Sequence, residues 1–251
     1  MQSENLSIEI GNDVSVELVK ITAGAFTLSS GVYAQALTLD EFYMGKYPLT
    51  NEQYSEFLLD TNGASPEHWV GRLTPPQSIL KHPVVGVEWR DAQAFVEWLS
   101  DLSGKNFRLP SEAQWEKAAR AATGRLFPWG NDWIDTGEAP PAPRIYMGDD
   151  TWLSVRTVAV GTTSPLTDSP YGCADMCRNV WEWCSSAARD YPYDASDGRE
   201  DLANQEGVQR VLRSAVFDGK EPFNATERHF ARPFDSRDIF GFRIAMEYQA
   251  S

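Results

Sequence analysis

The most reactive side chains of this 251-residue chain are three cysteines, Cys173, Cys177 and Cys184, which lie within twelve residues of one another. A thiolate can act as a nucleophile or bind a metal ion. The spacings of three and six residues, with no histidine nearby, match no zinc pattern, and an odd number of cysteines cannot all form disulfides within the chain. We therefore expect small thiols buried in a core. Catalysis through Cys173 or Cys177 remains open as an alternative.

The three histidines are far apart in the sequence, at His68, His82 and His229. A non-haem iron site needs histidines gathered with a carboxylate, so the pattern does not indicate one. His82 stands before a proline, and we expect it to be a structural hydrogen-bonding residue.

Several short elements must position these side chains. Alternating segments bounded by Gly, Asn or Pro predict strands at residues 6–10, 14–21, 26–28 and 42–47. Thr50 can then cap a helix that carries Tyr54, Phe57 and Leu58 on one face.

Two further amphipathic helices are predicted over about residues 91–122. Asp91 is the N-cap or a first-turn anion of the first helix, and Gly104 ends it. Ser111 and Gln114 form a capping box at the start of the second helix. The apolar stripes of the two helices are Ala92, Phe95, Val96 and Leu99, and Trp115, Ala118, Ala119 and Ala122.

Residues 124–207 show little periodicity, which is typical of functional loops or of loops held by specific contacts. The chain closes with strand candidates at residues 209–217 and 240–248, on either side of a polar and aromatic loop. Because no repeat or low-complexity linker divides the sequence, we expect a single domain over residues 1–251.

The overall charge limits the function. With 22 Lys+Arg against 36 Asp+Glu, the net charge is 22 − 36 = −14, and no run of basic residues occurs. Such a chain is not expected to bind nucleic acid. Because no apolar run of 18 residues and no basic leader is present, we also expect no membrane association and a cytoplasmic location.

Six segments carry a family resemblance: residues 42–51 (FYMGKYPLTN), 82–92 (HPVVGVEWRDA), 108–116 (RLPSEAQWE), 127–130 (FPWG), 179–183 (NVWEW) and 241–243 (GFR). Over about residues 20–247, their order and spacing resemble the formylglycine-generating-enzyme, or sulfatase-modifying-factor, domain family. The resemblance implies an α+β fold, a variant of the C-type lectin fold with two helices, short strands and many loops.

The same resemblance bears on catalysis. Formylglycine-generating enzymes bind copper through a cysteine pair that precedes the closing Gly-Phe-Arg, but residues 210–243 here contain no cysteine. A soft copper(I) ion needs such ligands. We therefore expect no copper and no enzymatic activity. The alternatives are an oxidoreductase with a non-standard active site and a pseudoenzyme subunit that regulates an active relative.

The chain is most similar to the variable proteins of diversity-generating retroelements, which bind ligands through a segment near the C-terminus. Residues 210–213 (RVLR) and 241–243 bound that segment here, and Arg228 takes its arginine position. The segment differs from the family pattern in having Ser214 and Ala215 where relatives have two glycines. Arg178 likewise replaces a glycine before the NVWEW motif.

A protein ligand is expected to contact this segment, because aromatic and Arg side chains often anchor interfaces. The candidate contact residues are Val216, Asp218, Lys220, Glu221, Phe223, Glu227, His229, Phe230, Arg232, Phe234, Asp235, Arg237, Asp238 and Ile239. We expect His229, Phe230 and Arg232 to be exposed and Phe240 to pack beneath them. Five basic and five acidic residues make residues 213–238 locally neutral.

Calcium is the cofactor that the resemblance implies. Relatives bind it near the NVWEW motif, and Asn179 and Glu182 supply the oxygen atoms that Ca²⁺ prefers. Asn131 and Asp132 are weaker candidates. The alternative is that Asn179 caps a turn and that Glu182 pairs with an arginine such as Arg243.

Overall fold

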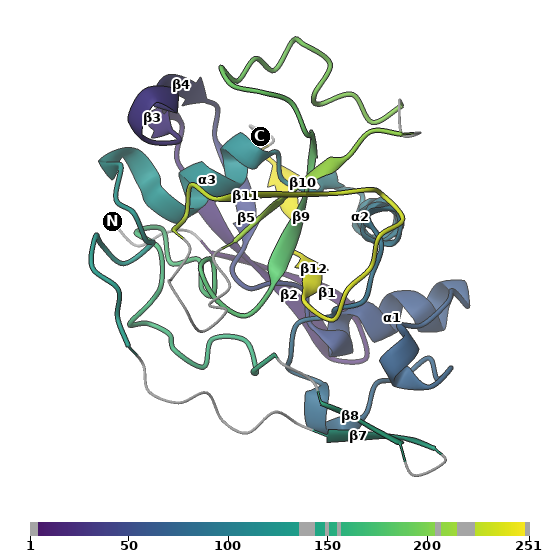
Figure 1. The fold of residues 1–251 in the computed structure, drawn as a ribbon. Coiled ribbons are helices and arrows are strands. Elements are labelled where there is room, and N and C mark those ends of the chain that lie inside the picture. The colour runs from purple at the N-terminus through teal and green to yellow at the C-terminus, as the bar shows by residue number, and fades with distance from the viewer. Residues whose placement is uncertain are drawn as a thin grey trace.

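A computed structural model describes residues 5–135, 144–148, 151–154, 157–203, 207–214 and 224–248. The fold is α+β, as expected (Figure 1). Its helices are α1 (Asn51–Thr61), α2 (Trp89–Ser103) and α3 (Glu112–Arg120). Short 3-10 turns lie at Gly31–Tyr33, Glu67–Trp69, Gln77–Ile79 and Ala121–Thr123.

Two sheets form the body of the molecule. The first has the order β1-β2-β5-β13-β6, with β1 (Leu6–Gly11), β2 (Val14–Ile21), β5 (Phe42–Gly45), β13 (Ala245–Glu247) and β6 (Phe107–Arg108). The second has the order β11-β10-β9-β12, with β11 (Arg228–Ala231), β10 (Arg210–Arg213), β9 (Trp181–Ala187) and β12 (Phe240–Phe242). Two hairpins complete the strands: β3 (Gly24–Leu28) with β4 (Gln35–Leu39), and β7 (Arg144–Gly148) with β8 (Thr151–Ser154).

The helix starts follow the sequence closely. Ser111 forms the predicted capping box of α3, and Thr50 caps α1 as predicted, there through a capping box with Gln53 that was not predicted. Helix α2 begins at Trp89, two residues before the expected start, because Glu88 is the N-cap and Asp91 accepts a bond from its backbone N–H. The described part of the chain therefore has three α-helices rather than the two that the resemblance implied.

The strands near the C-terminus differ more from the prediction. Strand β9 was missed because all seven of its residues are buried, so it shows no alternation. Residues 228–231 form a strand instead of a loop, through antiparallel pairing with β10. The candidate strand at 240–248 divides between the two sheets, as β12 and β13, and residues 215–217 lie outside the described residues.

The core explains the glycine of the closing Gly-Phe-Arg segment. A Cβ atom on Gly241 would lie 2.5 Å from the backbone oxygen of Val84. The Val84 oxygen is a main-chain atom of a fully buried residue, so it cannot move cheaply.

Gly241→Ala is therefore expected to lower the free energy of unfolding by about 1–3 kcal/mol or more, measured by denaturant unfolding. Gly63→Ala is the control, because its Cβ would meet the flexible side chain of Leu58. Equal losses in the two variants would contradict the steric argument.

Candidate ligand-binding surface

Helix α3 carries two fully buried carboxylates on one face, Glu112 and Glu116, one helical turn apart. An ionised carboxylate in a protein interior is costly unless it is paired and hydrogen-bonded. The pairing partners of Glu112 and Glu116 come from distant segments of the chain. The two side chains therefore fix where those segments lie.

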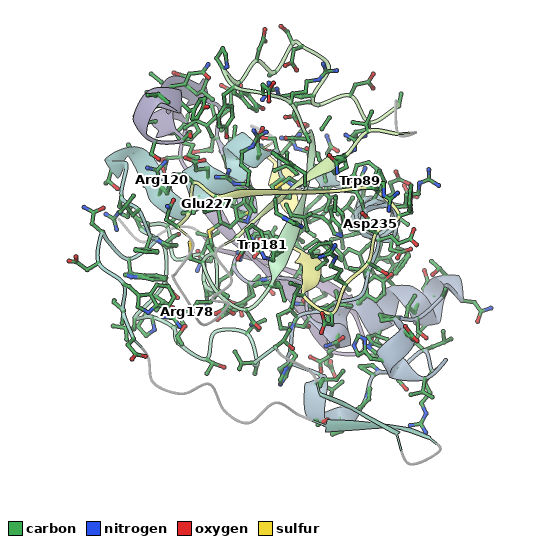
Figure 2. All side chains as sticks on the ribbon, viewed as in Figure 1. Trp89, Arg120, Arg178, Trp181, Glu227 and Asp235 are labelled. Carbon is green, nitrogen blue, oxygen red and sulfur yellow. The ribbon has the colours of Figure 1, made fainter. Side chains whose placement is uncertain are left out.

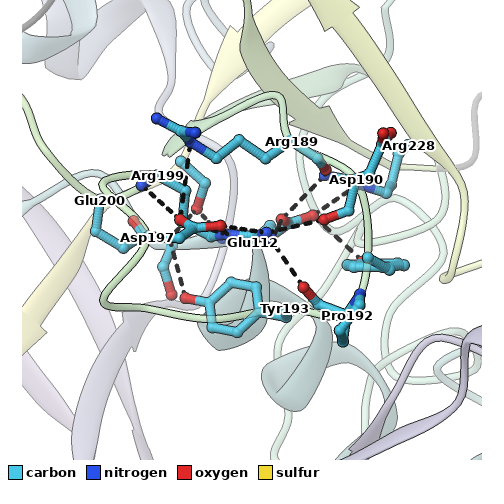
Figure 3. A network of polar contacts seen from close by, with 12 residues as sticks. Glu112, Arg189, Asp190, Pro192, Tyr193, Asp197, Arg199, Glu200 and Arg228 are labelled. Atoms are coloured by element: carbon cyan, nitrogen blue, oxygen red, sulfur yellow. Dashed lines mark hydrogen bonds and ion pairs between the residues drawn. The ribbon is translucent and has the colours of Figure 1, made fainter.

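Glu112 accepts contacts from three side chains (Figure 3). Its Oε2 pairs with Arg228 Nε at 2.8 Å, and its Oε1 accepts from Arg228 at 3.1 Å and from Arg199 at 3.3 Å. The hydroxyl of Tyr191 donates to Oε2 at 3.3 Å. Glu112 thus joins strand β11 to the 190–203 loop.

Glu116 likewise holds the turn that follows β3 against α3. It accepts the backbone N–H of Ser29 at 2.5 Å and also pairs with Arg120 and Arg213. The β3–β4 hairpin consequently lies against α3 (Figure 1).

These anchors bring four planar side chains into a row. The rings of Tyr33 and Tyr191 are 6.3 Å apart. The guanidinium of Arg228 lies 4.4 Å from the Tyr191 ring and 4.9 Å from the Phe230 ring. The buried carboxylate of Glu112 neutralises the charge of the Arg228 guanidinium. The row therefore presents mainly flat apolar surface to solvent. We call Tyr33, Tyr191, Arg228 and Phe230 the aromatic row.

A depression of about 670 Å³ lies along the aromatic row. The hydroxyl-bearing residues Ser29, Ser30 and Thr226 line it, together with the acidic residues Asp190 and Glu227. Tyr33 is 61% exposed and Phe230 is 39% exposed, so solvent reaches both ends of the row. Large exposed aromatic side chains beside a depression are typical of binding surfaces.

The structure places the predicted contact residues as follows. Phe230, Arg232, Phe234, Arg237 and Asp238 are exposed, while Glu227, His229, Asp235 and Ile239 are half-buried. His229 is less exposed than expected, because its ring packs between Trp181 and Phe240 at 5.5 and 5.7 Å. Phe240 is buried, as predicted. Val216, Asp218, Lys220, Glu221 and Phe223 lie outside the described residues.

The turn that follows β11 is held by backbone bonds. The N–H of Trp89 donates to Pro233 O at 3.1 Å, and the N–H of Gly86 donates to Arg237 O at 2.9 Å. Between these anchors Phe234 is 52% exposed. Figure 2 labels Glu227 before β11 and Asp235 in this turn. The start of α2 thus supports the second part of the candidate surface.

Sequence reasoning missed half of the aromatic row, Tyr33 and Tyr191, as well as Asp190. Each lies in a loop more than 35 residues from β11 in the sequence. One local signal was present at Tyr33, since Val32 and Tyr33 are two large apolar residues in a short turn. Nothing local marks Tyr191, whose place is set by its bond to Glu112.

The histidines take structural positions. His82 Nδ1 hydrogen-bonds with the hydroxyl of Thr157 at 3.0 Å, as predicted for a structural residue. His68 is buried beside Trp69, and burial lowers its pKa to about 4. In the described part of the chain, no group of three or more His, Cys, Asp or Glu side chains could hold a metal ion.

Of the calcium candidates, Glu182 takes up the alternative contact with Arg243, whereas Asn179 bonds to a distant segment rather than capping a turn. Both oxygens of the fully buried Glu182 accept from Arg243, at 2.6 and 2.7 Å, and the indole of Trp115 donates to Oε2 at 2.6 Å. Asn179, with a φ of 73°, bonds through its side chain to both backbone groups of Val158. Asn131 Oδ1 accepts from Leu126 N, and the side chain of Asp132 is exposed. Calcium therefore remains an expectation from the resemblance.

All three cysteines are free and fully buried, as predicted. Burial raises the pKa of Cys173 to about 11, and it raises the pKa values of Cys177 and Cys184 as well. A raised pKa leaves almost no thiolate at neutral pH, and the thiolate is the nucleophile. These cysteines are therefore poor candidates for covalent chemistry.

We expect no thiol of the native protein to react rapidly with Ellman's reagent at neutral pH, and all three to react after denaturation. A colorimetric time course with and without denaturant measures this. One fast-reacting native thiol would contradict the burial and would favour a catalytic cysteine.

Among the described residues, no helix is both long and apolar enough to cross a lipid bilayer.

The chain is 31% identical over 261 residues to the serine/threonine-protein kinase Pkn1 of Chlamydia trachomatis, an alignment that covers 92% of the chain but 38% of the kinase. The chain thus spans less than half the length of that relative.

Two solved structures share the fold over nearly the whole chain. PvdO from Pseudomonas aeruginosa superposes with a TM-score of 0.72 at 24% identity, covering 97% of this chain and 98% of that one. The Treponema denticola variable protein 1 gives 0.71 at 21% identity, covering 98% and 99%. A family model described as the sulfatase-modifying factor enzyme 1-like domain matches residues 11–248. The chain therefore belongs to the family of sulfatase-modifying factor enzyme 1-like domains.

Proposed function

We propose that the protein is a non-catalytic binding domain that holds a protein ligand on the aromatic row and the turn after β11. The observation that carries this proposal is the aromatic row, which combines four planar side chains from three separate segments. The buried Glu112 holds Tyr191 and Arg228 in the middle of the row, and Tyr33 and Phe230 are exposed at its ends. Rigid aromatic side chains of this kind supply contact area at low entropic cost.

Two further observations support a role without catalysis. Residues 210–243 contain no cysteine, and the three cysteines elsewhere are buried with raised pKa values. The Treponema denticola variable protein 1 has the same fold. The fold alone does not assign a function.

A pull-down tests the proposal. The immobilised full chain and two variants are each incubated with a lysate of the source cells, and the captured proteins are compared. Tyr33→Ala/Phe230→Ala removes the exposed ends of the aromatic row, whereas Leu59→Ala/Leu102→Ala removes comparably exposed apolar side chains on α1 and α2. A ligand of this surface, once purified, should bind the first variant weaker by about 2 kcal/mol or more and the control unchanged.

Retention of every captured protein by the first variant would contradict the proposal. Metal analysis of the purified chain provides an independent check. Stoichiometric copper or iron would favour the alternative, an oxidoreductase with a non-standard active site.

A further inference from the structure

A second cavity, of about 550 Å³, shares no lining residue with the depression along the aromatic row. It is bounded by the β4–β5 connection, the start of α3 and the 193–202 loop. Its size falls in the usual range for small-molecule sites. Neither the proposed function nor the fold requires this cavity.

One carboxylate in the cavity wall is held in a fixed orientation. Glu200 accepts hydrogen bonds from the hydroxyls of Ser186 at 2.6 Å, Tyr193 at 2.9 Å and Ser185 at 3.0 Å. Figure 3 shows Glu200 and Tyr193 together in the polar network. Three hydroxyl donors limit the rotation of this carboxylate.

Glu200 forms no direct ion pair within the described residues, although the buried Arg210 guanidinium interacts with its charge at longer range. Arg108 in the lining is already paired with Glu247, and Glu41 in the lining is paired with Lys20. With Asp40 also in the lining, the cavity carries more negative than positive charge. Such a cavity attracts cations.

A second polar group faces the cavity without a protein partner. Gln114 is 8% exposed, and its Oε1 accepts the backbone N–H of Ser111 at 3.0 Å in the capping box of α3. That bond assigns the other end of the side-chain amide as the nitrogen. In the described part of the chain, the Gln114 amide nitrogen donates to no protein group, so it is available to a molecule in the cavity.

The remaining lining includes the apolar side chains of Leu39, Phe42 and Leu202. We infer that the cavity binds a small organic cation, in which an ammonium or guanidinium group meets Glu200 and an acceptor oxygen meets the Gln114 amide. A short apolar chain between the two groups would contact the apolar lining.

Calorimetric titration of the full chain with matched probes tests this inference. N-acetyl-lysine amide, acetylated at its α-nitrogen, carries the side-chain ammonium, an apolar chain and a carbonyl acceptor. Its uncharged analogue, N-acetyl-norleucine amide, is expected to bind at least about tenfold more weakly, because a charge-assisted bond is lost. Pentylamine keeps the cation but lacks the acceptor. It is expected to bind at least about threefold more weakly than N-acetyl-lysine amide.

Two variants locate the binding at this cavity. Glu200→Gln removes the charge and should weaken N-acetyl-lysine amide about tenfold or more. Ala195→Trp adds bulk at an exposed position in the lining, so it should weaken the probe without disturbing the core. Glu97→Gln, on the exposed side of α2, is the charge-matched control and should leave the affinity within about twofold.

Circular dichroism shows whether each variant is folded, and Ala195→Trp carries the test if Glu200→Gln is not. The inference is overturned by any of three results. These are equal binding of the charged and uncharged probes, unchanged affinity in the folded variants, and no binding of any probe to the wild-type chain.

Discussion

Glu182→Gln should lower the free energy of unfolding by about 3–5 kcal/mol. Glu182 and Arg243 are both fully buried, and the two side chains meet through paired bonds of 2.6 and 2.7 Å. The substitution keeps the size of the side chain but leaves the Arg243 guanidinium in the interior without its counter-charge. Removing one partner of a buried pair costs far more than the pair itself contributes.

Chemical denaturation followed by tryptophan fluorescence measures the effect. The matched control is Glu17→Gln, which makes the same change in the exposed Glu17–Lys46 pair and should cost less than about 1 kcal/mol. Similar losses in the two variants would show that the buried charge is compensated in another way. A fall in the wild-type midpoint on adding a calcium chelator would indicate that the native chain binds calcium.

Glu112→Gln should cost a comparable amount, about 3–5 kcal/mol, and should also loosen the proposed ligand surface. Arg228 would lose its carboxylate partner, and Arg199 would keep only its pairing with Asp197. The Tyr191 hydroxyl would lose a charged acceptor. Because Arg228 is stacked between Tyr191 and Phe230, movement of its guanidinium would separate the aromatic row.

Denaturant unfolding gives the global effect, and hydrogen exchange gives the local one. We expect faster amide exchange in Glu112→Gln at residues 224–231 than in Glu182→Gln, when both are compared at conditions of equal global stability. Glu97→Gln again serves as the control, with a change below about 0.5 kcal/mol. Equal exchange of β11 in the two buried-charge variants would mean that Glu112 does not position the aromatic row.

Capping predicted the starts of α1 and α3 well because this signal is local, whereas periodicity was wrong for α3, which is buried on all sides and ends before the exposed Ala122. The capping boxes at Thr50 and Ser111 lie within four residues of sequence, and each helix begins where they place it. Strand β9 could not be predicted in this way. Its residues are buried on both faces, so polar and apolar positions do not alternate, and its place depends on pairing with β10 and β12.

By itself, the sequence determined the family, the fold class, the acidic charge and the absence of cysteine between residues 210 and 243. These properties depend on residue identity and short-range spacing. Tertiary structure alone decided that Tyr33, Tyr191, Arg228 and Phe230 form one row. It also showed that Glu182 meets Arg243, a pair that the sequence left as one of two alternatives. The physical reason is that buried carboxylates on α3 and β9 must be neutralised, and the arginines that do so come from distant positions in the chain.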